Sequence, residues 1–184
     1  MTKPGAILIG SLTLAAAACA GILVYAALVS PFRQLPSDAI VTARFRAHRA
    51  ELDALVAKAL PDSALVGAGQ GPAFPGLSVY VRDRPGSSRK LLPDQVRATG
   101  RSEYAALLHR AGIPSLSRSG DGNLVWFTLV SNTRARKGFV YSTQPLTPVR
   151  ESLDGLEDEV GSGRLAAAFV PLAPGWYLFL MGHD

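Results

Sequence analysis

The chain has 184 residues, of which 48% are hydrophobic and 18% are charged. This length suits one domain of ordinary size plus one additional apolar element, and the charged fraction lies below the roughly one quarter that is usual. A net charge of +5 favours anionic surfaces or simple solubility without choosing between them. The single cysteine, Cys19, excludes an intramolecular disulfide and a cysteine-based zinc site in the rest of the chain.

The N-terminal part of the chain contains a long uncharged run. Residues 6–29 carry no charged side chain, and Ser30 and Pro31 close the run. A bilayer core needs roughly 20 apolar residues in a helix, so the run is long enough to cross. We therefore predict an N-terminal transmembrane anchor over residues 1–30, a linker over 31–37 and a single domain over 38–184. The first expected partner is the lipid bilayer, through residues 6–29.

Two other interpretations of this run stay open. One is a cleaved signal peptide that uses the small residues around Cys19, and the other is a lipoprotein with Cys19 as the lipidated residue. Ala16 stands where a lipidation box prefers a larger aliphatic residue, and a further apolar stretch, residues 21–29, follows Cys19. Both features disfavour processing, so we expect an uncleaved signal anchor.

The flanking charges bear on orientation. Lys3 and the α-amino group precede the run, while several arginines follow it: Arg33, Arg44, Arg46 and Arg49. A count of basic residues near the span would put the domain in the cytoplasm. However, long domains translocate largely regardless of charge, and a short basic tail before an apolar run is typical of a signal anchor. We expect a single-pass protein of the cell inner membrane with a periplasmic domain.

Residues 38–60 show the pattern of an amphipathic helix. Ser37 or Asp38 can cap its start, and Pro61 ends it. Apolar positions recur at alternating steps of four and three, giving the stripe Val41, Phe45, His48, Leu52, Leu55 and Ala59. Because His48 is the only polar member, we expect a core histidine whose ring nitrogens are both hydrogen-bonded, and not a metal ligand.

The remaining pattern predicts a second helix and several short strands. The helix covers residues 102–111, where Gly112 and Pro114 stop it. Strands are expected over 77–81, 124–130, 139–142, 165–171 and 176–181, with a tight turn at Asp121-Gly122. We expect loops or turns over 65–76, 84–90 and 134–137. Two helices and about six mostly sequential strands predict an α+β domain with a mostly antiparallel sheet.

No catalytic, cofactor-binding or metal-binding residue is predicted. His48, His109 and His183 are far apart and have no ligand spacing. We expect His109 on the polar face of its helix and His183 to be mobile near the chain end. The glycines of residues 67–71 lack the preceding strand and following helix of a phosphate-binding loop. No cofactor is therefore expected.

Basic residues gather in the middle of the chain. One group is Arg82, Arg84, Arg89, Lys90, Arg97 and Arg101, and a second is Arg134, Arg136 and Lys137. Nucleic-acid surfaces interleave such charges with stacking aromatic residues, and only Tyr80 is near. We therefore expect solvated basic turns and no nucleic-acid partner. Near a bilayer the same charges could bind anionic headgroups, at about 1 kcal/mol per residue.

Three short motifs carry a resemblance. They are Phe45-x-x-His48-Arg49, the run KGFVYS over residues 137–142 and the run GWYLF over residues 175–179. Together they resemble uncharacterised small envelope proteins of Gram-negative bacteria, which are single-pass membrane or lipoprotein-like proteins. The resemblance implies an envelope location and carries over no active site. The mid-span position of Cys19 departs from the lipoprotein members.

These observations favour a membrane-anchored, non-enzymatic envelope domain that contacts a partner protein or the membrane surface. One alternative is an envelope hydrolase or other enzyme whose site is assembled from residues that the sequence does not pair. Another is an immunity-type protein that neutralises a toxin, which would share the small size and the anchor.

The anchor can be tested by extraction. We expect the full-length protein to stay in the membrane fraction after a carbonate wash, because the uncharged run is long enough to span the bilayer. Membrane fractionation with N-terminal sequencing measures this. A soluble domain whose new N-terminus lies near residue 21 would contradict the prediction.

Overall fold

The computed structural model describes residues 34–70, 77–84 and 86–183. Residues from Leu35 onward form one compact unit. The predicted anchor, residues 1–30, lies outside the described part of the chain. Among the described residues, no helix combines the length and the apolar character needed to cross a membrane.

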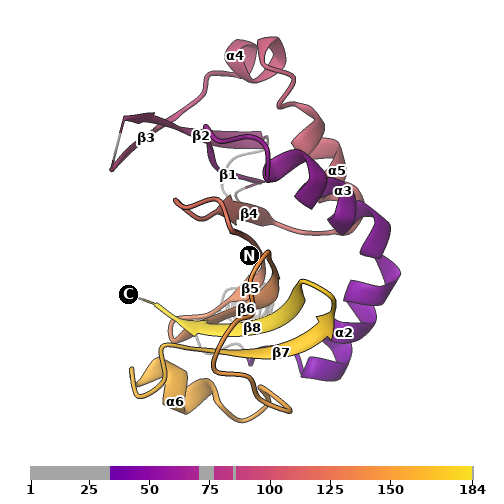
Figure 1. Ribbon diagram of the computed structural model, residues 1–184, viewed down its shortest axis with the longest axis vertical. Helices are drawn as coiled ribbons and strands as arrows, with labels where there is room; N and C mark the ends of the chain where they lie inside the picture. Colours follow the sequence, from indigo (N-terminus) through magenta and orange to yellow (C-terminus); the bar gives the residue numbers. More distant parts are fainter. Residues whose placement is uncertain (1–33, 71–76, 85, 184) are drawn as a thin grey trace, which may run out of the picture. The chain divides into compact units, whose positions relative to one another are not determined.

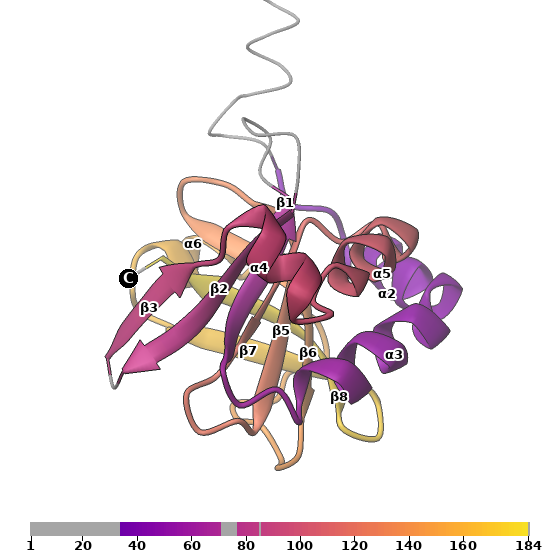
Figure 2. The same cartoon turned by 90° about the horizontal axis from the view of Figure 1, so that it is seen from above.

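The domain is built on one antiparallel sheet (Figures 1 and 2). Its strands are β1 (Leu65–Gln70), β2 (Leu77–Arg84), β3 (Ser87–Lys90), β4 (Ser115–Arg118), β5 (Leu124–Ser131), β6 (Ala135–Ser142), β7 (Ala167–Ala173) and β8 (Trp176–Gly182). Their order across the sheet is β3-β2-β1-β4-β5-β6-β8-β7. Neighbours in space are mostly neighbours in sequence, as the turn signals predicted.

Three helices lie on the same side of this sheet (Figure 1). They are α2 (Asp38–Ala47), α3 (Arg49–Ala59) and α5 (Glu103–Ala111), and two short helices, α4 (Pro93–Ala98) and α6 (Glu157–Gly161), stand at its ends. The predicted α+β class with an antiparallel sheet is confirmed. The described residues form five helices where two were predicted. The helices α4 and α6 are too short to show a helical period, and the first predicted helix is divided into α2 and α3.

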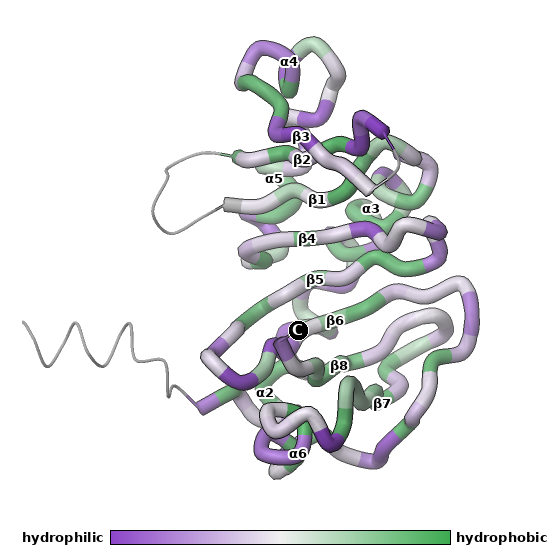
Figure 3. The backbone as a smooth tube through the Cα atoms, turned by 90° about the vertical axis from the view of Figure 1, so that its left-hand side faces the viewer, coloured by the Kyte–Doolittle hydropathy of each residue, from purple (hydrophilic) through white to green (hydrophobic). Residues whose placement is uncertain are grey.

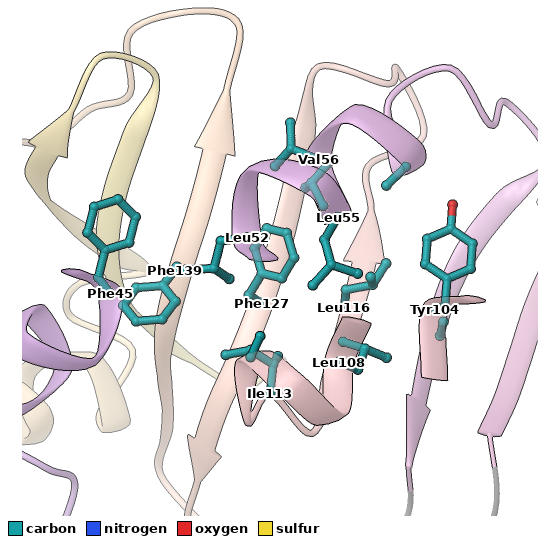
Figure 4. Packing of buried hydrophobic residues seen from close by; sticks show 14 of the residues in the cluster. Phe45, Leu52, Leu55, Val56, Tyr104, Leu108, Ile113, Leu116, Phe127 and Phe139 are labelled. Carbon is teal, nitrogen blue, oxygen red and sulfur yellow. The ribbon is translucent and has the colours of Figure 1, made fainter. Parts of the chain in front are cut away.

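The main core lies between these helices and the sheet (Figure 4). One row of directly opposed, buried strand residues runs through Val79, Ala68, Leu116, Phe127, Phe139 and Leu178. The indole ring of Trp176 lies 5.3 Å from the Phe45 ring and 5.6 Å from the Phe127 ring. Its Nε1 donates to Asp53 Oδ1 at 3.0 Å, which fixes α3 against β8.

The first predicted helix is interrupted at His48. This residue has φ −119° and ψ 22°, so it ends α2 and precedes α3. The apolar stripe is otherwise confirmed, since its other five members are all buried. The prediction of a core histidine was wrong for His48: its side chain is half-buried, and its ring makes no hydrogen bond within the described residues.

The predicted loop over residues 65–76 was also wrong in its first half, since Leu65–Gln70 is the inner strand β1. A Cβ at Gly67 would lie 2.9 Å from the Leu116 carbonyl oxygen, and one at Gly69 would lie 2.8 Å from Ser115 Cβ. The glycines are therefore strand residues that let β1 and β4 approach closely. Residues 71–76 lie outside the described part.

Two basic segments predicted as turns are partly strands. Ser87–Lys90 forms the edge strand β3, whose residues are all exposed. Charged side chains on an edge strand discourage pairing with other chains. Residues 135–137 belong to β6. The helix over 103–111, the β4–β5 hairpin and the β7–β8 hairpin are confirmed, and Gly112 ends α5 with φ 62°.

Lys137 is buried, with only 2% of its surface exposed. Its Nζ lies 2.7 Å from Asp38 Oδ1 and 2.9 Å from Asp154 Oδ1, and it donates to the Pro36 carbonyl oxygen at 2.9 Å. The ammonium group thus donates to the Pro36 carbonyl and to Asp154, and it forms a close ion pair with Asp38. We call Lys137, Asp38 and Asp154 the buried charge cluster.

The carboxylates of this cluster are themselves held. Asp38 Oδ2 accepts from the Leu153 amide at 2.6 Å and from Ser152 Oγ at 2.8 Å, and Asp154 accepts from the Asp38 amide at 2.9 Å. Burial acts to raise the pKa of Asp38, but the hydrogen bonds from Lys137, Leu153 and Ser152 outweigh it and lower that pKa. The cluster therefore joins the start of α2, strand β6 and the segment before α6.

We expect Lys137→Met to lower the free energy of unfolding by about 3–5 kcal/mol, because it leaves two carboxylates without their cation. We also expect Asp38→Asn to destabilise the protein at pH 7. The pKa of Asp38 is lower in the folded protein than in the unfolded chain. The ionised carboxylate therefore stabilises the folded state fully at pH values above the unfolded pKa, and this stabilisation is lost as the pH falls through the folded pKa.

Denaturant unfolding of the full chain in detergent, measured from pH 7 to pH 3, checks both variants. The gap between parent and Asp38→Asn should shrink as the pH falls below about 4. The control variant Asp83→Asn changes an exposed carboxylate, and its free energy of unfolding should equal that of the parent at every pH. A gap for Asp38→Asn that does not change with pH would contradict the assignment.

Candidate binding face of the sheet

The sheet face turned away from the helices is here called the open face, and Figure 3 looks onto it. Because opposed residues share a face, the strand register defines what it presents. One row crosses all eight strands through Lys90, Tyr80, Gly67, Ser117, Trp126, Val140, Tyr177 and Pro171. The next row runs through Ser78, Gly69, Ser115, Thr128, Gly138, Phe179 and Phe169.

The half of the open face over β6, β8 and β7 is filled by its own side chains. Val140, Phe169 and Phe179 are buried there, and Leu146 packs against them. The Trp126 ring meets Phe179 edge-on with centroids 5.0 Å apart. This aromatic cluster closes one half of the face and leaves Trp126 at its border.

The other half, over β3 to β5, carries a groove of about 820 Å³. Small residues form much of its lining: Gly67, Gly69, Ser78, Ser88, Ser115, Ser117 and Thr128. Larger side chains stand along it, including Tyr80, Lys90, Leu129 and Val130. Glycine and serine project little above the backbone, so their alternation with core residues on β1 and β4 creates the depression. Tyr80 is 42% exposed, an uncommon position for a large apolar ring.

A second, smaller cavity of about 180 Å³ adjoins the groove and shares Ser117 and Thr128 with it. Arg136 lines this cavity beside Trp126. Arg136 Nη2 lies 3.0 Å from Met181 Sδ, while its Nε is buried without a hydrogen-bond partner. None of the described residues lining either cavity is acidic. The charged side chains that line the two cavities are therefore all basic.

The basic residues predicted from sequence do not form one surface. Ion pairs join Arg97 to Asp94, Arg101 to Asp62 and Arg134 to Asp158, and Lys137 belongs to the buried charge cluster. The expectation of solvated basic turns was wrong for Lys137, which is buried, and for Arg101, whose side chain is 16% exposed. Lys90 and Arg136 come to the open face from the two predicted groups.

His48 lies between α2 and α3, and His109 is exposed on α5, as predicted for His109. His183 follows β8, and its Nε2 lies 2.8 Å from the Asn132 carbonyl oxygen and 3.2 Å from the Oγ of Ser131, a residue that lines the groove. The described residues contain no group of three or more His, Cys, Asp or Glu side chains placed to hold a metal ion.

The sequence analysis did not identify the open face. A signal was present, since Gly67-Ala68-Gly69 and Ser115-Leu116-Ser117 both alternate small residues with one buried apolar residue. This is the period of two that marks a strand with one covered face. This pattern was not recognised in β1 because glycine is depleted in strands.

No family model matches the chain, and neither the curated proteins nor the solved structures include a significant match to it. The function is therefore inferred from the geometry of the open face together with the sequence.

The fit between β1 and β4 can be tested at Gly67. We expect Gly67→Ala to lower the free energy of unfolding by about 1–3 kcal/mol, because the new methyl group would press on the Leu116 carbonyl. The exposed neighbour Ser117→Ala should change it by less than about 0.5 kcal/mol. Denaturant titration of both variants checks this, and equal stabilities would show that β1 does not need a glycine here.

Proposed function

We propose that the chain is a membrane-tethered, non-enzymatic envelope domain that binds a partner protein through the open face of its sheet. The observation that carries the proposal is the one-sided helix layer, in which α2, α3 and α5 cover one face of the sheet (Figure 1). The other face keeps a groove of about 820 Å³. A concave surface with apolar walls and a few polar groups is the usual form of a binding site.

The make-up of the groove supports its role as a contact surface for a protein. Its described lining consists of glycine, hydroxyl and aliphatic residues with Tyr80 and Lys90. Tyrosine is enriched at protein interfaces, where its ring supplies contact area and its hydroxyl a hydrogen bond. The mixed apolar and hydroxyl lining therefore suits contact with the surface of another protein.

The tether supports an envelope role. The uncharged run ends at residue 29, and the compact unit begins at Leu35. The side chain of Leu35 is buried, and Lys137 holds the Pro36 carbonyl, so the fold fixes the chain from this point. The five residues between can reach at most about 18 Å. With the run in the inner membrane, the domain would stay close to the bilayer on the periplasmic side.

Site-specific photocrosslinking in native membranes tests the binding face. A benzoylphenylalanine placed at Tyr80 or Ser117 should yield one shared crosslinked partner protein, because both positions are exposed on the open face. The same probe at Ala106 or His109, which are exposed on α5, is the matched control and should not capture that partner.

Crosslinks that arise only from the α5 positions would contradict the proposed face. Labelling of phospholipid but of no protein at Tyr80 and Ser117 would contradict the proposal of a protein partner.

A further inference from the structure

The charges on the open face indicate what kind of partner segment it takes. Lys90 is exposed on β3, and within the described residues its ammonium group has no ion pair and no hydrogen bond. Arg136 is half-buried on β6, and its guanidinium likewise has no carboxylate partner in the described part of the chain. Arg136 lines the smaller cavity, so its guanidinium is a group with which a carboxylate in that cavity would pair.

These two cations stand on either side of an uncharged floor. Between β3 and β6 the sheet contains β2, β1, β4 and β5, so five inter-strand steps separate the two cations, or about 24 Å across the sheet. Arg136 also lies four residues along β6 from Val140, which shares the row of Lys90, and this adds an offset of about 14 Å along the strand. Hydroxyls and glycines lie between: Ser78, Gly67, Gly69, Ser115, Ser117 and Thr128. The diagonal between the two cations is about 28 Å, and an extended peptide advances about 3.4 Å per residue, so about eight residues cover this distance.

We propose that the groove and the smaller cavity beside it bind an extended, acidic segment of the partner protein, about eight residues long, with carboxylates near both ends and small apolar or hydroxyl residues between them. This inference rests on the proposed function and adds the chemistry of the ligand. Carboxylates near Lys90 and Arg136 would form charge-assisted hydrogen bonds. The shallow floor admits small side chains, and Leu129 and Val130 supply apolar contact.

A protein segment fits this lining better than a glycan. Sugar hydroxyls both donate and accept, and side-chain amides and carboxylates match them with two polar atoms each. The described residues lining the groove include no Asp, Glu, Asn or Gln side chain. Aliphatic side chains and single hydroxyls instead match the mixed polar and apolar surface of a peptide.

Capture on peptide libraries tests the proposal with the full-length chain in detergent. The acidic library consists of octapeptides with two glutamates at each end and any of Ala, Val, Ser or Thr between them. The matched library has lysines in place of the glutamates. We expect the chain to be retained by the acidic library at least tenfold more than by the lysine library, and retention should weaken as salt rises.

Three variants separate this site from general charge attraction. Lys90→Glu and Arg136→Gln should each reduce retention at least fivefold. Arg110→Glu makes the same charge change as Lys90→Glu at an exposed position on α5, and it should retain the parent behaviour. Thermal unfolding of each variant confirms that it is folded, and Lys90→Glu remains a sufficient test if Arg136→Gln does not fold.

Equal retention by both libraries would overturn the acidic ligand, and so would equal losses for Lys90→Glu and Arg110→Glu. Binding to phosphatidylglycerol vesicles that needs Lys90, without retention by the acidic library, would overturn it in favour of lipid. If the photocrosslink from Ser117 persists in Lys90→Glu and Arg136→Gln, the binding face stands and only its proposed ligand chemistry fails.

Discussion

The buried charge cluster is the interaction on which the arrangement of this domain depends. Lys137 lies on β6 with its ammonium group inside the protein, and Asp38 and Asp154 bring the start of α2 and the segment before α6 to it. A buried charge is tolerated only when it is fully paired, so these three elements must assemble together. Because Asp38 opens α2, the same contacts set where the helix layer begins on the sheet.

The position of the helix layer explains why the sheet has one open face. Leu52 and Leu55 of α3 pack on the rows that contain Phe127 and Leu116 (Figure 4), and the opposite rows carry Gly67, Ser115 and Ser117. Beyond β5 the aromatic cluster closes the face without help from a helix. The groove therefore lies on the part of the open face where the strands carry small residues in place of aromatic ones.

Much of the fold followed from local sequence patterns, whereas the site did not. Gly112 marks the end of a helix and Asp121-Gly122 marks a tight turn, so α5 and the β4–β5 hairpin were predicted. The strand β1 was missed because Gly67 and Gly69 are strand residues only in the presence of β4, which is distant in sequence. Lys137 was predicted to be in a solvated turn because its carboxylate partners, Asp38 and Asp154, come from other parts of the chain. Long-range pairing of this kind has no local signature.

Oxidative footprinting of the full-length protein tests the central claim, that the open face is occupied in the native membrane, most directly. Hydroxyl radicals would be applied to native membranes and to the purified chain in detergent, and oxidation of Tyr80 would be compared with that of His109 on α5. We predict that Tyr80, 42% exposed in the isolated domain, is protected in native membranes while His109 reacts equally in both samples. Equal oxidation of Tyr80 in the two samples, with protection confined to His109, would contradict the account.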